Sequence, residues 1–523
     1  MKPLKVFIVL VAIIGLSSAV LFAQADTPKF EKVRGKPPAG QPFLSNLNAA
    51  EIENAISFLP PPLMARLAKQ HGISSVRGKS IANFSSPKNA KERAEYADRP
   101  VSAYDDAYET NASIAARPNN VNIVVAAFEE RYGGYSWTAT SLDKGETWSV
   151  PKKLPPRVAS DYVYTPVIRY SPNSAYLYAV YASEDFYTHL VYIMISRSTN
   201  NGSSWSAPKV AFYPGDYDGD GYIDTLFRPW VDVHYFSTST ANPYVYITCN
   251  LQEDDGGLRM LFRRSKDSAS TVMSSYWYVT GGFLLGSRAI GGKNGEVLWF
   301  MTAASGFSTS LPFYILSLPS KDFGNTFTSM TSSVSLYYQP PYYLGPNSAY
   351  GFWFESMYPS VAMTSSGVAY LAVTVDPISG SATAEDGDIW LMKSPRPYST
   401  WSMPIGLGTG WGGQGFPSVR AKKTSSGTVI AVAFEDHSQS YADNEFYDIS
   451  MIYTGLTGGY NFARLTDIVS LTPFYWTQEY IDSSASASLT DKVIHVIWTD
   501  RADKLDYEDE ESDVYCDIID LIY

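Results

Sequence analysis

The stretch Ser141–Trp148 reads Ser-Leu-Asp-Lys-Gly-Glu-Thr-Trp, and altered copies of it occur at Ser198–Trp205 and Ser320–Phe327. Within this pattern, an Asp or Asn side chain can accept backbone N–H groups inside a tight turn, and the glycine permits a positive φ. The aromatic residue then begins the next strand and anchors it in a core. The recurrence of this hairpin turn predicts a modular, all-β fold.

The chain from residue 101 onward consists of short β-type runs with turn signals between them. Spacings of roughly 55–70 residues between repeats are typical of four-stranded propeller blades with long loops. The sequence therefore predicts a β-propeller over residues 101–523, with seven blades favoured and six as the alternative. The seven aligned units begin near Ser113, Pro166, Arg228, Arg288, Pro359, Pro417 and Ser484.

The seventh unit ends after its third strand, Val514–Ile522, because the chain ends there. We expect a strand within Val101–Ala107 to supply the missing outer strand. That arrangement would pair the two ends of the propeller and remove a sheet edge.

The N-terminal region differs from the rest of the chain. Lys2 and Lys5 precede the apolar run Val6–Leu21, and Ala23-Gln24-Ala25 is a cleavage site, so residues 1–25 are predicted to be a signal peptide of a secreted or periplasmic protein. No other segment is apolar enough for a membrane span. Residues 26–100 are predicted to form a short helical segment and a polar linker, which could be a pro-region or a docking arm.

Charge and cysteine content limit the possible partners. The net charge is −12, and loss of Lys2 and Lys5 makes it −14, which argues against a nucleic-acid partner and fits cation binding. Cys249 and Cys516 are the two cysteines, and we expect them to be buried free thiols. No histidine spacing, Gly-x-Ser-x-Gly elbow or phosphate loop supports zinc, serine or nucleotide chemistry.

The repeated turn resembles the Asp-box (BNR repeat) of sialidase-like β-propellers, and His495–Arg501 is similar to the closing module of secreted Asp-box proteins. The resemblance covers about residues 105–523. In that family the Asp-box joins the third and fourth strands of a blade, on the face away from the binding site. It therefore implies that Asp143, Asn200 and Asp322 are structural.

The resemblance also implies where sialidase chemistry would lie. Sialidases hold the substrate carboxylate with three arginines and use a Tyr–Glu nucleophile pair and an Asp acid/base. Bidentate guanidinium groups match a carboxylate, and tyrosine avoids the repulsion that an anionic nucleophile would meet. This chain lacks the Arg-Ile-Pro motif, and none of its 39 tyrosines stands out. The candidate arginines are Arg228, Arg288 and Arg420, which could face the central funnel or pair with acids.

Acidic residues recur at the ends of the predicted second strands, in six of the seven repeats. They could form an acidic binding face, or they could be ordinary solvated loop residues. The residues are Glu129, Glu130, Glu184, Asp185, Asp254, Asp376, Glu435, Asp436 and Asp500.

The run from residue 216 to 224 has the oxygen-donor spacing of a calcium loop, with glycine at its sixth position. Position 12 is Phe227 and not Glu, so the run is no complete EF-hand. We expect calcium to order a loop here in a structural role, and a plain Asp/Gly turn is the alternative. The expected ligands are Asp216, Asp218, Asp220, the carbonyl of Tyr222, and Asp224.

Three functions remain open from the sequence. The first is a glycan- or protein-binding propeller without catalysis, and the second is an exo-glycosidase of the sialidase superfamily. The third is a scaffold or assembly factor for envelope proteins. The sequence does not decide the oligomeric state.

Overall fold

The computed structural model describes residues 99–521 with gaps, so the predicted signal peptide and residues 26–98 lie outside the described part. Among the described residues, no helix is long and apolar enough to cross a membrane. The gaps are residues 103–108, 131–132, 218–222, 235–242, 253–257, 267–268, 271, 273–275, 280–282, 305–312, 328–330, 337–357, 376–387, 408–413, 426, 437–445, 455–459, 467–469, 472–485, 491 and 501–512.

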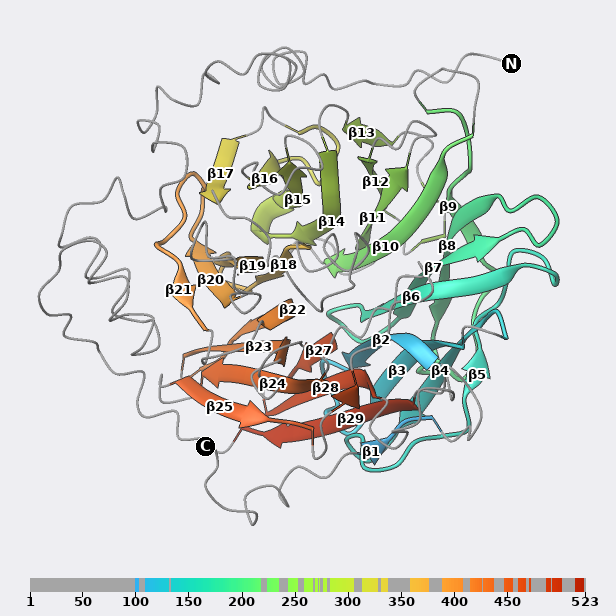
Figure 1. Cartoon of the computed structure of the whole chain (residues 1–523), viewed down its shortest axis with the longest axis horizontal. Helices are drawn as coiled ribbons and strands as arrows, with labels where there is room; N and C mark the ends of the chain where they lie inside the picture. Colours follow the sequence, from blue (N-terminus) through green and yellow to red (C-terminus); the bar gives the residue numbers. More distant parts are fainter. Residues whose placement is uncertain are drawn as a thin grey trace, which may run out of the picture.

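Seven antiparallel sheets surround a central axis, which confirms the seven-bladed β-propeller (Figure 1). In blades 1 to 6 the four main strands follow one another outward in sequence order, because each hairpin joins neighbouring strands, whereas the outermost strand of blade 7 comes from the start of the described chain. The described residues contain one short 3₁₀ turn, η2 (Lys293–Gly295), and are otherwise strands and loops.

Each blade runs from an innermost strand at the axis to an outermost strand at the rim. Blades 1 to 3 are β2 (Glu109–Ala116), β3 (Val124–Glu130), β4 (Tyr135–Ser141) and β5 (Lys152–Lys153); β6 (Tyr162–Tyr170), β7 (Leu177–Glu184), β8 (Val191–Ser198) and β9 (Lys209–Phe212); and β10 (Thr225–His234), β11 (Tyr244–Gln252), β12 (Leu258–Ser265) and β13 (Trp277–Val279). Blades 4 and 5 are β14 (Phe283–Gly291), β15 (Val297–Ala304), β16 (Phe313–Ser320) and β17 (Thr331–Leu336); and β18 (Ser360–Met363), β19 (Ala369–Val375), β20 (Asp388–Ser394) and β21 (Ile405–Gly406). Blades 6 and 7 are β22 (Gln414–Lys423), β23 (Thr428–Asp436), β24 (Phe446–Thr454) and β25 (Tyr460–Arg464), with β26 (Ser470–Leu471) beside β24; and β27 (Ser486–Leu489), β28 (Val493–Asp500), β29 (Asp513–Asp520) and β1 (Arg99–Pro100).

Each of the seven interfaces between neighbouring blades holds one apolar cluster. Phe128, Trp299 and Trp498 are among the largest fully buried side chains. Cys249 and Cys516 are buried free thiols in two different interfaces, as expected from the sequence. The core is therefore distributed around the ring, and every blade depends on both of its neighbours.

The ring closes between blades 7 and 1. β1 pairs with β29, and the Val101 N–H donates to the Val514 carbonyl at 2.8 Å. The strand that closes the ring is therefore Arg99–Pro100, directly before the predicted range Val101–Ala107, of which residues 103–107 lie outside the described part. Arg99 anchors the strand at this position, because it forms ion pairs with Glu146 of blade 1 at 2.7 Å and Asp517 of blade 7 at 2.9 Å.

Hydroxyl groups on the innermost strands hold neighbouring blades together near the axis. A serine oxygen accepts a backbone N–H from the next blade at four of the seven interfaces. These bonds satisfy backbone donors that the strands of one blade cannot pair. The pairs are Ser113 with Ile168 (3.2 Å), Ser360 with Val419 (2.9 Å), Ser418 with Ala487 (3.1 Å) and Ser486 with Ile114 (3.4 Å).

The Asp-box turns lie between the third and fourth strands, as the resemblance implied. In the first copy, Asp143 accepts the Thr147 N–H at 2.9 Å, and Ser141 Oγ accepts the Gly145 N–H at 2.7 Å. Asp322 and Asn200 accept the equivalent N–H groups at 2.8 and 2.9 Å. The three side chains are therefore occupied within their turns.

The blades have two distinguishable ends. β4 begins opposite Glu130 and ends opposite Val124, so the Asp-box after Ser141 lies at the Val124 end of its blade. The N-terminal end of each innermost strand lies at the other end, which we call the funnel face. The Asp-boxes therefore lie on the face opposite the funnel.

Replacement of Asp143 by alanine should lower the free energy of unfolding by about 1 kcal/mol, as for loss of a turn-capping acceptor. Asp143→Asn is the matched control, because asparagine occupies this position in the second copy and accepts the same N–H. Urea denaturation of both variants checks this expectation. Equal losses in the two variants would contradict the assigned role.

His495 of blade 7 is buried, and its Nε2 donates to the Lys144 carbonyl in the blade 1 Asp-box at 2.8 Å. Burial lowers the pKa of His495 to about 4, below the value of about 6.5 in an unfolded chain. The unfolded state therefore takes up a proton first as the pH falls. Protonation of His495 in the unfolded state should therefore lower the free energy of unfolding by up to about 3 kcal/mol between pH 6.5 and 4.

His495→Gln keeps a donor for Lys144 but does not titrate, so its stability should fall less on acidification. Glu109, whose burial raises its pKa to about 8, acts in the opposite sense, and the difference between wild type and variant isolates His495. Urea midpoints measured from pH 7 to 4.5 provide the comparison. Parallel curves for the two proteins would refute the role of this histidine.

Candidate functional site

A β-bulge recurs near the start of the innermost strand in five blades, at the funnel face. A bulge bends its strand and redirects a side chain, and bulges are common beside functional sites. Four of the five bulge residues with positive φ are not glycine, which is uncommon and points to a constrained site. These residues are Asn111 (φ 54°), Thr165 (φ 50°), Arg228 (φ 49°), Gly286 (φ 65°) and Phe416 (φ 51°).

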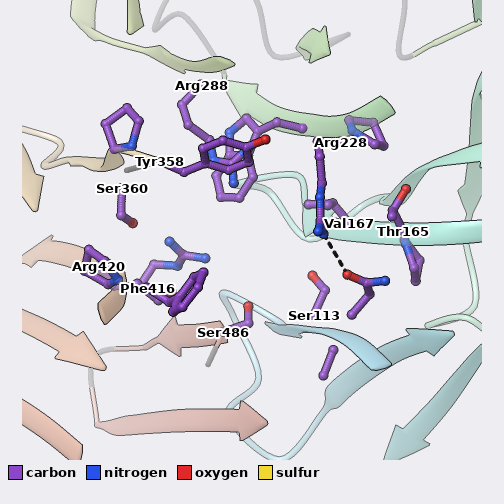
Figure 2. A pocket seen from close by; sticks show the side chains of 18 residues that line it. Ser113, Thr165, Val167, Arg228, Arg288, Tyr358, Ser360, Phe416, Arg420 and Ser486 are labelled. Atoms are coloured by element: carbon purple, nitrogen blue, oxygen red, sulfur yellow. Dashed lines mark hydrogen bonds between the residues drawn. The ribbon is translucent and has the colours of Figure 1, made fainter. Parts of the chain in front are cut away.

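The bulges surround a cavity of about 110 Å³ on the axis, which we call the funnel. Figure 2 shows Arg228, Arg288 and Tyr358 along one part of its wall and Arg420 across from Arg228. All three candidate arginines from the sequence therefore line one cavity. The described lining residues include no Asp or Glu.

Arg228 is held at the rim by a chain of hydrogen bonds. Its Nη1 donates to Asn111 Oδ1 at 2.9 Å, which is the dashed line in Figure 2. Asn111 Nδ2 donates to Glu129 at 2.6 Å, and the same carboxylate oxygen accepts the Thr165 N–H at 2.9 Å. A buried carboxylate thus positions the rim residues of blades 1, 2 and 3.

Trp230 lies between two arginines. The Arg288 guanidinium carbon is 4.3 Å from the centroid of the Trp230 ring, and that of Arg169 is 4.6 Å away. Arg288 also lies 5.5 Å from the centroid of the Tyr358 ring. These cation–π contacts fix the guanidinium groups without neutralising their charge.

A second cavity, of about 210 Å³, lies further along the axis and includes Arg169, Arg420 and Asp232. Trp230 and Arg420 line both cavities, so the two share part of their walls, and we call the two together the axial cavity. Burial lowers the pKa of Arg169 to about 10, with Asp232 acting to raise it and Arg288 to lower it. Burial and the neighbouring charges of Arg169 and Arg288 lower the pKa of Arg420.

Arg169 was not among the candidates from the sequence, although a local signal for it exists. Pro166–Arg169 and Pro417–Arg420 both read Pro-x-x-Arg, beginning at the bulge of an innermost strand. Asp232 follows Pro229 with the same spacing. Position-by-position comparison of the seven units places these three residues at one level of the axis.

Tyr358 is the tyrosine that lines the funnel among the described residues. Its hydroxyl accepts a hydrogen bond from Asn250 Nδ2 at 2.9 Å. Asn250 Oδ1 accepts the Ser287 N–H at 3.3 Å, so the phenol is tied to blades 3 and 4. Because the chain has 39 tyrosines, the sequence alone could not select this one.

The predicted acidic residues do lie at the funnel face, since Glu129, Glu184 and Asp436 pair with the starts of innermost strands. Several are engaged within the fold. Glu129 holds the rim, and Asp436 accepts hydrogen bonds from Gln414 at 3.3 Å and Ser450 at 3.1 Å.

The remaining acids differ in their surroundings. Glu130 accepts a bond from Trp137 at 2.8 Å, and Asp185 pairs with Arg157 at 2.8 Å. Glu435 is buried, and Asp500 lies in β28. Asp254 and Asp376 lie outside the described residues. An acidic binding face therefore stays a prediction.

Exposed aromatic side chains lie beside the funnel on blade 2. Tyr162 and Phe186 have ring centroids 5.4 Å apart, and Phe186 and Tyr187 are 5.2 Å apart. Phe186 is 45% and Tyr187 80% exposed. We call these three residues the aromatic ridge; Tyr162 begins the strand that carries Thr165 to the funnel.

The predicted calcium loop joins β9 to β10 on the funnel face. Gly215 and Asp224 form a β-bridge that brings its ends together, and Asp224 Oδ2 accepts the Tyr217 N–H at 2.8 Å. Asp216 is exposed, whereas Asp218, Asp220 and Tyr222 lie outside the described residues. Calcium binding stays a prediction.

No family model matches the chain, and no curated protein matches it. Among solved structures, the chain is similar to a protein of unknown function from Dyadobacter fermentans DSM 18053, with 12% identity, 81% of this chain and 98% of that chain covered, and a TM-score of 0.42. It is similar to the α-L-arabinanase of Penicillium chrysogenum, with 13% identity, coverage of 71% and 98%, and a TM-score of 0.41. It is also similar to the Hadza microbial sialidase Hz136, with 13% identity, coverage of 76% and 73%, and a TM-score of 0.41. At this level of similarity these structures carry no information about the activity of this chain.

Proposed function

We propose that the funnel binds the carboxylate end of an acidic glycan and does not hydrolyse it. The observation that carries this proposal is the convergence of Arg228, Arg288 and Arg420 on one cavity of a protein with net charge −12. Guanidinium groups match carboxylates in a planar, bidentate geometry. A local positive field inside an acidic protein favours a small anionic group over an extended acidic surface.

The aromatic ridge supports a glycan as the rest of the ligand. Tyrosine and phenylalanine rings offer broad apolar faces, and a tyrosine hydroxyl can also form hydrogen bonds. Contiguous exposed apolar side chains on a soluble protein mark interaction sites. A sugar whose acidic end enters the funnel could place its following rings against Phe186 and Tyr187.

Catalysis is less well supported than binding. Besides its nucleophile, a glycosidase needs an ionisable group that acts as general acid or base beside the scissile bond. None of the described funnel-lining residues is a carboxylate, and Glu129 is used to hold Asn111 and Thr165. The presence of Tyr358 near the arginines is the observation that favours the hydrolase alternative.

Arg228→Met should weaken binding of an acidic oligosaccharide about 10- to 100-fold, because charge-assisted hydrogen bonds contribute roughly 1.5–3 kcal/mol. Tyr187→Ala should weaken it about 3- to 10-fold through lost ring contacts. A glycan array that includes 3′-sialyllactose and its neutral parent lactose identifies a ligand. Calorimetric titration with that ligand then compares the variants.

Arg197→Met is the matched control, because Arg197 lies on the third strand of blade 2 and bonds Ser270, away from the funnel. A preference for neutral glycans, or equal affinity in Arg228→Met, would contradict the proposed site. Hydrolysis of a fluorogenic sialoside that is lost in Arg288→Met would instead establish the hydrolase alternative.

We also propose that calcium orders the loop of residues 216–224. Acidic oxygens at alternate positions and the bridge between Gly215 and Asp224 support a compact cation loop. Addition of a chelator should lower the melting temperature of wild type, and Asp218→Ala together with Asp220→Ala should remove that effect. A melting curve that does not respond to chelator would refute calcium binding.

A further inference from the structure

We propose that the deeper part of the axial cavity is a separate site for a small oxyanion of the sulfate or phosphate class, held between Arg169 and Arg420. The site lies one level below the funnel mouth and uses residues from blades 2 and 6. It does not depend on the nature of the ligand that the funnel receives.

The donors of this site are buried, and some have no protein partner. Arg169 and Arg420 each donate from Nη1 to the carbonyl of the preceding residue, at 2.9 and 2.8 Å. Their Nη2 atoms are shielded from solvent and have no hydrogen-bond partner among the described residues. Trp230 Nε1 is likewise shielded from solvent and has no hydrogen-bond partner among the described residues. Three N–H donor groups that line one cavity therefore lack acceptors, which is costly unless a ligand supplies them.

The charges around the cavity do not balance. Arg169 and Arg420 interact electrostatically with each other, with Arg288 and with Asp232. Asp232 is the one carboxylate among the described residues that line the deeper cavity, and its Oδ2 already accepts the Gly291 N–H at 2.8 Å. The two buried guanidinium groups of Arg169 and Arg420 thus share one carboxylate. Water can satisfy donors, but only an anion can offset the excess positive charge.

The shape of the site favours a compact oxyanion. A cavity of about 210 Å³ is several times the roughly 30 Å³ that one water occupies in the liquid, so a tetrahedral anion fits. The cation–π contact between Arg169 and Trp230 holds one guanidinium group in place before binding. Preorganised guanidinium forks suit sulfate and phosphate oxygens.

The anion would link the innermost strands of blades 2 and 6 across the axis, and it should therefore stabilise the ring. A ligand that binds only the folded state stabilises it, and the stabilisation grows with the ratio of the ligand concentration to the dissociation constant. The probe is sodium sulfate at low millimolar concentration, where general salting-out is small, compared with sodium chloride at equal ionic strength. The readout is the melting temperature of the full chain after dialysis into sulfate- and phosphate-free buffer.

We expect sulfate to raise the melting temperature of wild type by several degrees, and to have little effect on Arg169→Met or Arg420→Met. In sulfate-free buffer Arg420→Met should melt at or above the wild-type temperature, because it removes an uncompensated buried charge. Arg197→Met is the matched control and should respond to sulfate as wild type does.

Equal stabilisation of wild type and both variants would identify a general salt effect and overturn the proposal, as would no stabilisation of wild type. Arg228→Met separates this site from the funnel. It should lose glycan affinity while it keeps the sulfate response. A sulfate response without glycan binding would contradict the proposed function alone, and glycan binding without a sulfate response would contradict the deeper site alone.

Discussion

Closure of the ring is the constraint on which the rest of this structure depends. Every blade buries its faces against two neighbours, so blade 7 needs a fourth strand and a contact with blade 1. Arg99 meets this need through ion pairs to both blades, one of them to Glu146 of the blade 1 Asp-box, and His495 joins the same two blades through the same turn. Only a closed ring brings residues far apart in the sequence, such as Arg169 and Arg420, to one axial cavity.

The axis has a local excess of positive charge in a chain whose net charge is −12. The bulged innermost strands place arginines of four blades around the funnel and the cavity below it. Burial strengthens the electrostatic interactions of these charges, since little solvent screens them. It also increases the free-energy cost of leaving the charges without a counter-ion. Binding an anion relieves this cost, so the same feature supports both a ligand in the funnel and a smaller anion beneath it.

The sequence predicted much of the fold but less of the site. The Asp-box turns and the repeat spacing indicated seven blades, because turn chemistry is local and can be read from a few residues. Arg228, Arg288 and Arg420 were identified because they lie at or near predicted innermost strands, yet Arg169 and Tyr358 were missed. Their placement depends on bulges and ring closure, which join positions hundreds of residues apart. The burial of Glu129 at the rim could not be predicted from the sequence either, since an acidic residue at a strand end is ordinarily solvated.

The central claim is that the axis of this propeller is an anion site. Bromide is a spherical anion with a measurable anomalous signal, and a crystal soaked in it would locate such a site directly. The account predicts an anomalous peak inside the axial cavity, within hydrogen-bonding reach of the Arg169 and Arg420 guanidinium groups. Anomalous peaks confined to the outer surface, with an axial cavity filled by water alone, would contradict it.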